Sequence, residues 1–203
     1  LIRGISMALT KVQIISNAVT QLGHAPVVSL IDQDELVVAA EQAFDMLLPS
    51  KLAEGNWRFA TKIEQLSQLV ETPPPPYVYS FQLPSGWLKV LKVYPNIYDW
   101  NIFNNDRIYT FQQGPWYMEY IYQPDVSKLP AHFVNYFVFE IAAYLCLSNA
   151  EKTDYYAVIK QECIRQQGMA LSVDCQNHPQ FTQVDFPVLG NRYIGGVYPN
   201  SIN

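Results

Sequence analysis

Four consecutive prolines, at positions 73–76, constrain the fold of this chain more than any other feature. Proline fixes φ and lacks a backbone donor, so neither a helix nor a central strand can run through them. Before them, apolar residues recur at helical intervals, whereas residues 77–123 are rich in β-branched and aromatic side chains. We interpret the prolines as a stiff connector between a helical and a strand-rich segment, with a ligand for an aromatic groove as the alternative.

Apolar spacing and helix-end signals predict four helices, over residues 10–22, 34–54, 130–150 and 153–171. Thr10 is suited to cap the first helix, and Gly23 is suited to stop it in the left-handed conformation. Pro49 is expected to end or kink the second helix. Pro130 fits the first turn of the third, which is apolar around so much of its circumference that we expect it to be central.

The predicted fold class is α+β, mainly α: a bundle of about four helices with one small antiparallel sheet between the second and third long helices. The sheet is expected within residues 77–123 and has three or four strands. Residues 8–172 are expected to form this domain, after an N-terminal extension at 1–7.

An extended C-terminal tail is expected over residues 173–203. Prolines and glycines break any helix there, yet four aromatic residues recur: Phe181, Phe186, Tyr193 and Tyr198. Solvated tails are normally poor in aromatic residues. We therefore expect this tail to lie on a partner.

The composition indicates a subunit of an assembly. Charged residues make up 15% of the chain, against a usual share of about 25%, and aromatic residues make up 14%. Aromatic side chains are enriched at protein interfaces, although a dry core is the alternative explanation. The net charge of −5 and the absence of a Lys/Arg run argue against binding to nucleic acid through its phosphates.

The residues give no sign of an enzyme or a metal site. His24, His132 and His178 have no ligand spacing with Cys, Asp or Glu, and there is no GxSxG elbow or phosphate-binding glycine loop. We expect no catalytic residue, cofactor or metal. The three cysteines form no CxxC pair and are expected to be reduced packing thiols, and no apolar run is long enough to predict a membrane partner.

Two local groups have a structural and a functional interpretation. Asp32, Asp34 and Glu35 suit the N-terminus of a helix, with a cation site as the alternative. The tryptophans of the strand-rich segment, Trp87 among them, suit packing, with a stacking platform for carbohydrate or nucleobases as the alternative.

Five aromatic residues are predicted to be structural anchors: Trp57, Phe59, Trp87, Phe133 and Phe137. The first two follow a helix stop, and the last two lie on the stripe of the central helix. None has a chemical group nearby that predicts a role beyond packing.

Four motifs are similar, in the same order, to those of the tail tubular protein A family, the head-to-tail adaptors of short-tailed bacteriophages. They are residues 21–30 (QLGHAPVVSL), 57–60 (WRFA), 83–90 (LPSGWLKV) and 129–133 (LPAHF). Asn56 and Gly86 depart from the family pattern, which has Pro and Asp at these positions.

The resemblance implies a structural virion protein rather than an enzyme. It implies a ring, usually of twelve copies, between the portal protein and the tail nozzle protein, through which double-stranded DNA passes without specific binding. The tail aromatics would then bind the portal, and the protein would reside in the neck of the virion after assembly in the host cytoplasm. The alternative is a tail-associated protein that binds or hydrolyses glycans.

Overall fold

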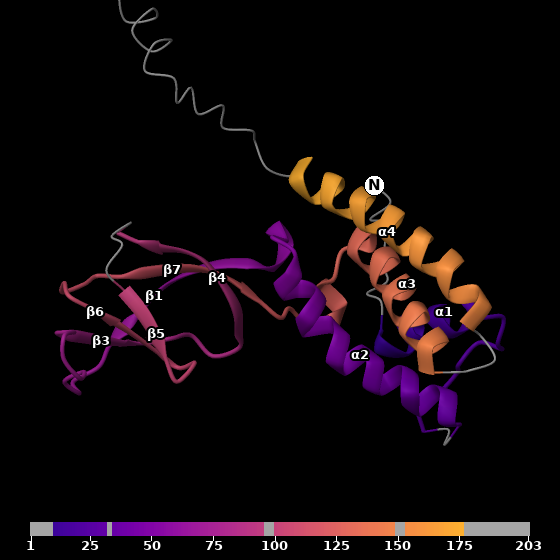
Figure 1. Cartoon of the computed structure of the whole chain (residues 1–203), viewed down its shortest axis with the longest axis horizontal. Helices are drawn as coiled ribbons and strands as arrows, with labels where there is room; N and C mark the ends of the chain where they lie inside the picture. Colours follow the sequence, from indigo (N-terminus) through magenta and orange to yellow (C-terminus); the bar gives the residue numbers. More distant parts are fainter. Residues whose placement is uncertain (1–9, 32–33, 96–99, 149–152, 177–203) are drawn as a thin grey trace, which may run out of the picture.

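The computed structural model describes residues 10–31, 34–95, 100–148 and 153–176. These residues form two lobes, a helical bundle and a β lobe (Figure 1). The four helices of the bundle are α1 (Lys11–Gln21), α2 (Glu35–Glu54), α3 (Ala131–Ser148) and α4 (Thr153–Gln176). The strands lie between α2 and α3 in the chain, where the sequence predicts a β insertion.

Local signals set the ends of the first two helices. Thr10 caps α1 in a capping box with Gln13, and Gly23 follows α1 with φ of +78°. The Asp34 carboxylate accepts a hydrogen bond from the backbone N–H of Leu36 and caps α2. These ends are as the sequence predicts.

α3 is the central helix of the bundle and contacts α1, α2 and α4. Most of its side chains are buried, including Phe133, Phe137 and Ile141. Within the described residues, α3 alone is long and apolar enough to cross a membrane by length and composition, and 61% of it is buried inside the protein. Its place in the core accounts for that composition.

The β lobe contains two antiparallel sheets that face each other. The first has the order β1 (Thr61–Gln65), β7 (Tyr117–Tyr122), β4 (Trp87–Tyr94), and the second has the order β2 (Ser67–Gln68), β3 (Tyr79–Gln82), β6 (Arg107–Thr110), β5 (Trp100–Phe103). One apolar cluster joins them, with Met118 and Tyr120 from the first sheet and Phe81 and Ile108 from the second. Ile121 of β7 packs instead into the core of the bundle, so the first sheet links the two lobes.

The predicted fold class is wrong. A mainly α protein with one small sheet is overturned by two antiparallel sheets of three and four strands. The prediction missed residues 61–68, which precede the prolines and form β1 and β2. This segment is polar and shows no clear alternation, and its main partner is far away in the chain: Thr61 pairs with Ile121. Local pattern cannot reveal such a pairing.

One helix end differs from prediction. α2 ends at Glu54 as predicted, and Pro49 lies inside it without ending it, so that Leu52 is placed in the core. α4 extends to Gln176, beyond the predicted end at residue 171. Its extra turn includes Asp174, which is buried and hydrogen-bonded.

Candidate interaction surfaces

Trp57 is the centre of an aromatic cluster where α2 ends. Its side chain is 1% exposed, and its Nε1 donates to the carbonyl of Lys51, 3.0 Å away, in the last turn of α2. Its ring centroid lies 5.0 Å from that of Phe133 and 6.0 Å from that of Tyr136. The Trp57 side chain therefore donates a hydrogen bond to a carbonyl in the last turn of α2 and also packs against α3.

The other predicted anchors are in two places. Phe59 is half-buried, and its ring centroid lies 5.1 Å from that of Phe133. Phe137 is enclosed and meets Phe44 of α2 edge-on at 5.3 Å. Trp87 lies apart in the β lobe, half-buried, and donates to the carbonyl of Asn105 at 3.2 Å. The predicted tail aromatics, Phe181, Phe186, Tyr193 and Tyr198, lie outside the described residues.

A buried carboxylate joins three helices. Glu140 of α3 is 7% exposed, and its Oε1 lies 3.6 Å from Nζ of Lys51 on α2 and 3.3 Å from Nζ of Lys160 on α4. Burial alone would raise the pKa of Glu140, but the hydrogen bond from Cys163 and the two ammonium groups together lower it. Glu140 is thus an ionised cross-link inside the bundle.

The same carboxylate acts on its neighbours. Burial and the charge of Glu140 raise the pKa of the Cys163 thiol to about 12 and raise the pKa of Tyr136. A thiol with so high a pKa is a poor nucleophile at neutral pH. These groups therefore support a structural role for Cys163, as its pattern in the sequence predicts.

A second buried carboxylate fixes the far end of α4. Asp174 accepts a hydrogen bond of 2.6 Å from the backbone N–H of Arg58, in the short helix η1 (Arg58–Ala60). Its Oδ1 also lies 3.6 Å from Nε2 of His132. Sequence reasoning assigned Asp174 to the tail. The signal that could have found it is its spacing of four from Ala170, which lies on the buried side of α4.

The outer side of α4 exposes several apolar side chains. Tyr155 is 61% exposed and Val158 is 68% exposed, and Met169 and Val173 are also exposed on this side. α4 lies along the edge of the bundle, where it packs on α3 and meets η1 (Figure 1). A soluble helix normally keeps such groups inward, so this side is a candidate contact surface.

The outer face of the second sheet carries a cluster of aromatic rings. The Phe103 ring stacks on that of Tyr109 with centroids 4.9 Å apart, and Tyr77 lies between Phe103 and Phe111, at 5.6 and 5.1 Å. Phe103 and Phe111 are exposed, and Asn101 donates to the Tyr77 hydroxyl. We call these four rings the outer aromatic face. Phe103 and Phe111 are its exposed members, whereas Tyr77 is half-buried and Tyr109 is buried.

The first sheet has a smaller exposed patch on the side away from the β-lobe core. Tyr117 and Tyr94 are opposite each other on β7 and β4, and both are exposed. Glu119 accepts a hydrogen bond of 3.2 Å from the Tyr94 hydroxyl, and Ile63 of β1 stands opposite Glu119. Both sheets of the lobe therefore present aromatic side chains to the outside.

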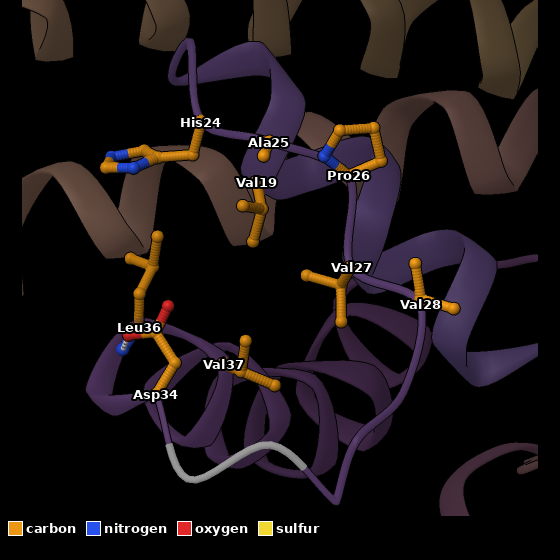
Figure 2. Close-up of a pocket in the computed structure, with 9 residues that line it drawn as sticks. All are labelled: Val19, His24, Ala25, Pro26, Val27, Val28, Asp34, Leu36 and Val37. Atoms are coloured by element: carbon orange, nitrogen blue, oxygen red, sulfur yellow. Dashed lines mark hydrogen bonds between the residues drawn. The ribbon is translucent and has the colours of Figure 1, made fainter.

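A shallow hollow of about 470 Å³ lies between the end of α1 and the start of α2 (Figure 2). Val19 and Val37 point toward each other across it, and the loop of residues 24–28 forms its other wall. The Asp34 carboxylate at its rim already caps α2. Its lining residues are apolar except for His24 and Asp34, and polar and apolar atoms share its surface.

The described residues contain no group of three His, Cys, Asp or Glu that could hold a metal ion. His24 lines the hollow, His132 lies beside Asp174, and His178 is outside the described residues. Of the predicted acidic group, Asp34 caps the helix and Asp32 is outside the described residues.

Comparison with known proteins does not assign this chain to a family. Neither a scan against protein-family models nor a search of curated proteins found a match to this chain. The functional assignment accordingly depends on the four motifs and on the surfaces described above.

Proposed function

We propose that this chain is a structural subunit of a head-to-tail adaptor, which forms a ring between the portal and the nozzle of a short-tailed phage. The observation that carries the proposal is that apolar and aromatic side chains are exposed on both lobes at once, on α4 and on the outer faces of both sheets. A ring subunit needs contacts with two neighbours and with partners above and below. Separate apolar surfaces on one small protein suit that requirement.

The positions of the motifs support the same proposal. Trp57 caps the short helix η1, which is formed by the next three residues of its motif, and the loop of residues 24–28 forms a wall of the hollow. Leu129 precedes α3 and packs into the bundle core. Three of the four motifs therefore lie at helix ends, and the fourth, residues 83–90, leads into β4 of the β lobe. These are positions that set the shape of a subunit.

The charge supports a channel that does not retain DNA. The chain has 13 basic and 18 acidic residues and a net charge of −5. A wall rich in cations would bind phosphates, whereas an acidic wall lets double-stranded DNA slide. We accordingly propose double-stranded DNA as a passing cargo and not as a specific ligand.

The test is to express the full chain together with the portal protein of a short-tailed phage and to image the product. The expected result is a ring, of twelve copies by the resemblance, on one end of the portal, with neighbours that bury roughly 1,600 Å² or more per contact. A product in which single copies sit apart on the portal, or no product at all, would contradict the proposal.

A second experiment addresses the proposed portal-binding residues, Phe181, Phe186, Tyr193 and Tyr198. Deleting residues 178–203 should leave the thermal unfolding of the two lobes unchanged and should abolish co-sedimentation with the portal. A truncated chain that still docks would show that the portal binds elsewhere.

The outer aromatic face favours a second candidate function, glycan binding. Sugar rings stack their C–H faces on aromatic side chains, and Asn101 lies at the margin of Tyr77. Equilibrium binding to glycans of the host surface would test this. The expected signs are saturable binding and its loss in Phe111→Ala; equal binding by wild type and variant would reject the face as a glycan site.

A further inference from the structure

We propose that the outer side of α4 pairs with the same side of a second copy of this chain, as an antiparallel helix pair with a twofold axis. The inference goes beyond the adaptor function. Neighbours in a ring are related by rotation about the ring axis, whereas this pair has a twofold axis of its own. We therefore assign the twofold pair of α4 helices to the protein outside the ring.

The first observation is the spacing along α4. The residues that form the seam follow one another at intervals of three and four, as the a and d positions of a heptad do. They are Tyr155, Val158, Glu162, Arg165, Met169 and Ser172. Of these, Glu162 is half-buried and the other five are exposed. Ile159, Cys163 and Ala170 are buried on the side of α4 that packs on α3, and the seam lies roughly a third of a turn around the helix from them, at the surface.

The second observation is the pair of charges in the middle of the seam. Nε of Arg165 lies 2.8 Å from Oε2 of Glu162, and Nη1 of Arg165 lies 3.2 Å from Sδ of Met169. The guanidinium is thus placed along the seam, between a carboxylate and an apolar side chain. Hydrogen bonds from Arg165 and Gln166 lower the pKa of Glu162 to about 2, so both charges are present at any ordinary pH.

These charges select the direction of the partner. In a parallel pair, equal positions meet, and Glu162 would face Glu162 while Arg165 faced Arg165. In an antiparallel pair centred between these two residues, a positions meet d positions. Glu162 of each copy then faces Arg165 of the other, and Val158 faces Met169. The sequence of this one helix is complementary to itself only when a second copy runs in the opposite direction.

The geometry leaves room for such a partner. α4 has 24 residues, which corresponds to a rod of about 36 Å. It is an edge helix of the bundle in Figure 1, and within the described residues it packs mainly on α3. A second α4 at the usual helix spacing of about 8–10 Å would cover the exposed Val158 and Met169 side chains.

The decisive experiment exchanges the central charges in the full chain and measures mass by sedimentation velocity over a wide concentration range. Wild type should reach twice the 23.2 kDa chain mass. Glu162→Arg alone and Arg165→Glu alone should each raise the dimer dissociation constant by roughly tenfold or more, because like charges then meet. A mixture of the two variants should regain the dimer, because opposite charges meet between unlike chains.

A matched pair of variants separates this effect from folding. Val158→Glu lies in the seam and should weaken the dimer, whereas Ile164→Glu, at a position 61% exposed on another side of α4, should leave it unchanged. Circular dichroism checks that each variant is folded. A monomeric wild type, or a mixture of the charge variants that stays monomeric, would overturn the inference. Equal weakening of the dimer by Val158→Glu and Ile164→Glu would overturn it as well. A ring-sized species unaffected by the charge exchange would overturn the pair while supporting the adaptor function.

Discussion

The helical bundle and the β lobe use their aromatic residues differently. In the bundle, Trp57, Phe133 and Phe137 are all enclosed, and each contacts rings from another element. In the β lobe, Trp116 is enclosed but Phe103 is 38% exposed, within a cluster on the outer sheet face. Aromatic residues therefore stabilise one lobe from inside and are available for contacts on the other. The high aromatic content of the chain combines these two roles.

The two lobes also differ in their buried polar groups. Glu140 and Asp174 of the bundle are buried carboxylates held by cations and a backbone N–H. Among the described residues of the β lobe, the buried polar side chains are those of Ser80 and Thr110, whose hydroxyls donate to backbone carbonyls at 2.7 and 2.9 Å. The stability of the bundle should therefore depend on pH, whereas these β-lobe contacts should not.

The largest expected effect is in the bundle core. Trp57→Ala removes a fully packed ring and the donor that satisfies the end of α2, and should lower the free energy of unfolding by about 3 to 5 kcal/mol. Urea unfolding measures this change. Trp87→Ala, at a half-buried ring of the β lobe, is the matched control and should cost clearly less. If both substitutions lower the free energy of unfolding by the same amount, the two lobes do not differ in how they bury aromatic side chains.

The next largest effect tests the buried charges. Glu140→Gln removes the charge that holds Lys51 and Lys160, and should cost about 2 to 3 kcal/mol at neutral pH. Because the pKa of Glu140 is lowered from 4.5 in the folded state, its contribution is present above that value and is lost as pH falls through the lower folded pKa. Chemical unfolding of both proteins at neutral and acidic pH measures this difference.

The matched control is Thr110→Val in the β lobe. Its hydroxyl does not titrate, so its cost, about 1 kcal/mol for one hydrogen bond, should be the same at both pH values. A gap between wild type and Glu140→Gln that stays constant on acidification would contradict ionised Glu140 as the cross-link.

Two glycines test how closely the end of α2 is packed. A Cβ on Gly55 would overlap the indole of Trp57, which is itself enclosed, so Gly55→Ala should destabilise the chain by roughly 1 to 3 kcal/mol. Gly168 in α4 has no neighbour near its Cβ position, so Gly168→Ala should stabilise by up to about 1 kcal/mol through helix propensity. Thermal unfolding should shift in opposite directions, and a shift in the same direction would contradict the packing.

The smallest expected effect is on the outer aromatic face. Phe103→Ala removes contacts with Tyr77 and Tyr109 but little burial, and should cost about 1 kcal/mol. If the face is a contact surface, the variant should lose binding to a tail partner or glycan while it remains folded. A cost as large as that of Trp57→Ala would show that the ring belongs to the core.

Much of the bundle could be predicted because its signals are local. Thr10 and Gly23 mark the ends of α1, and the apolar circumference of α3 predicts a central helix. Each signal depends on residues within a few positions, which one pass along the chain can read. Trp57 could be predicted as a packing residue on the same grounds, because it follows a helix end and has no reactive group beside it.

The β lobe and the candidate surfaces could not be predicted in the same way. The pairing of Thr61 with Ile121, the second sheet and the burial of Asp174 against Arg58 depend on residues that are far apart in the chain. Strand pairing is decided by burial and by partners across the sheet, and an isolated strand carries little of this information. The outer aromatic face is a clear example, since alternation places rings on two sides of a strand but does not say which side will be covered.

The sequence by itself determined the four helices, their order and most of their ends, and that strands lie between the second and third helices, because hydrogen bonds and side-chain contacts within a helix join residues three or four apart. Only the tertiary structure decided that the insertion forms two sheets, that Glu140 binds lysines from two other helices, and that α4 leaves Val158 and Met169 exposed. Those features depend on which distant segments meet. Contacts of that kind are selected by the packing of the whole chain and not by any one stretch of it.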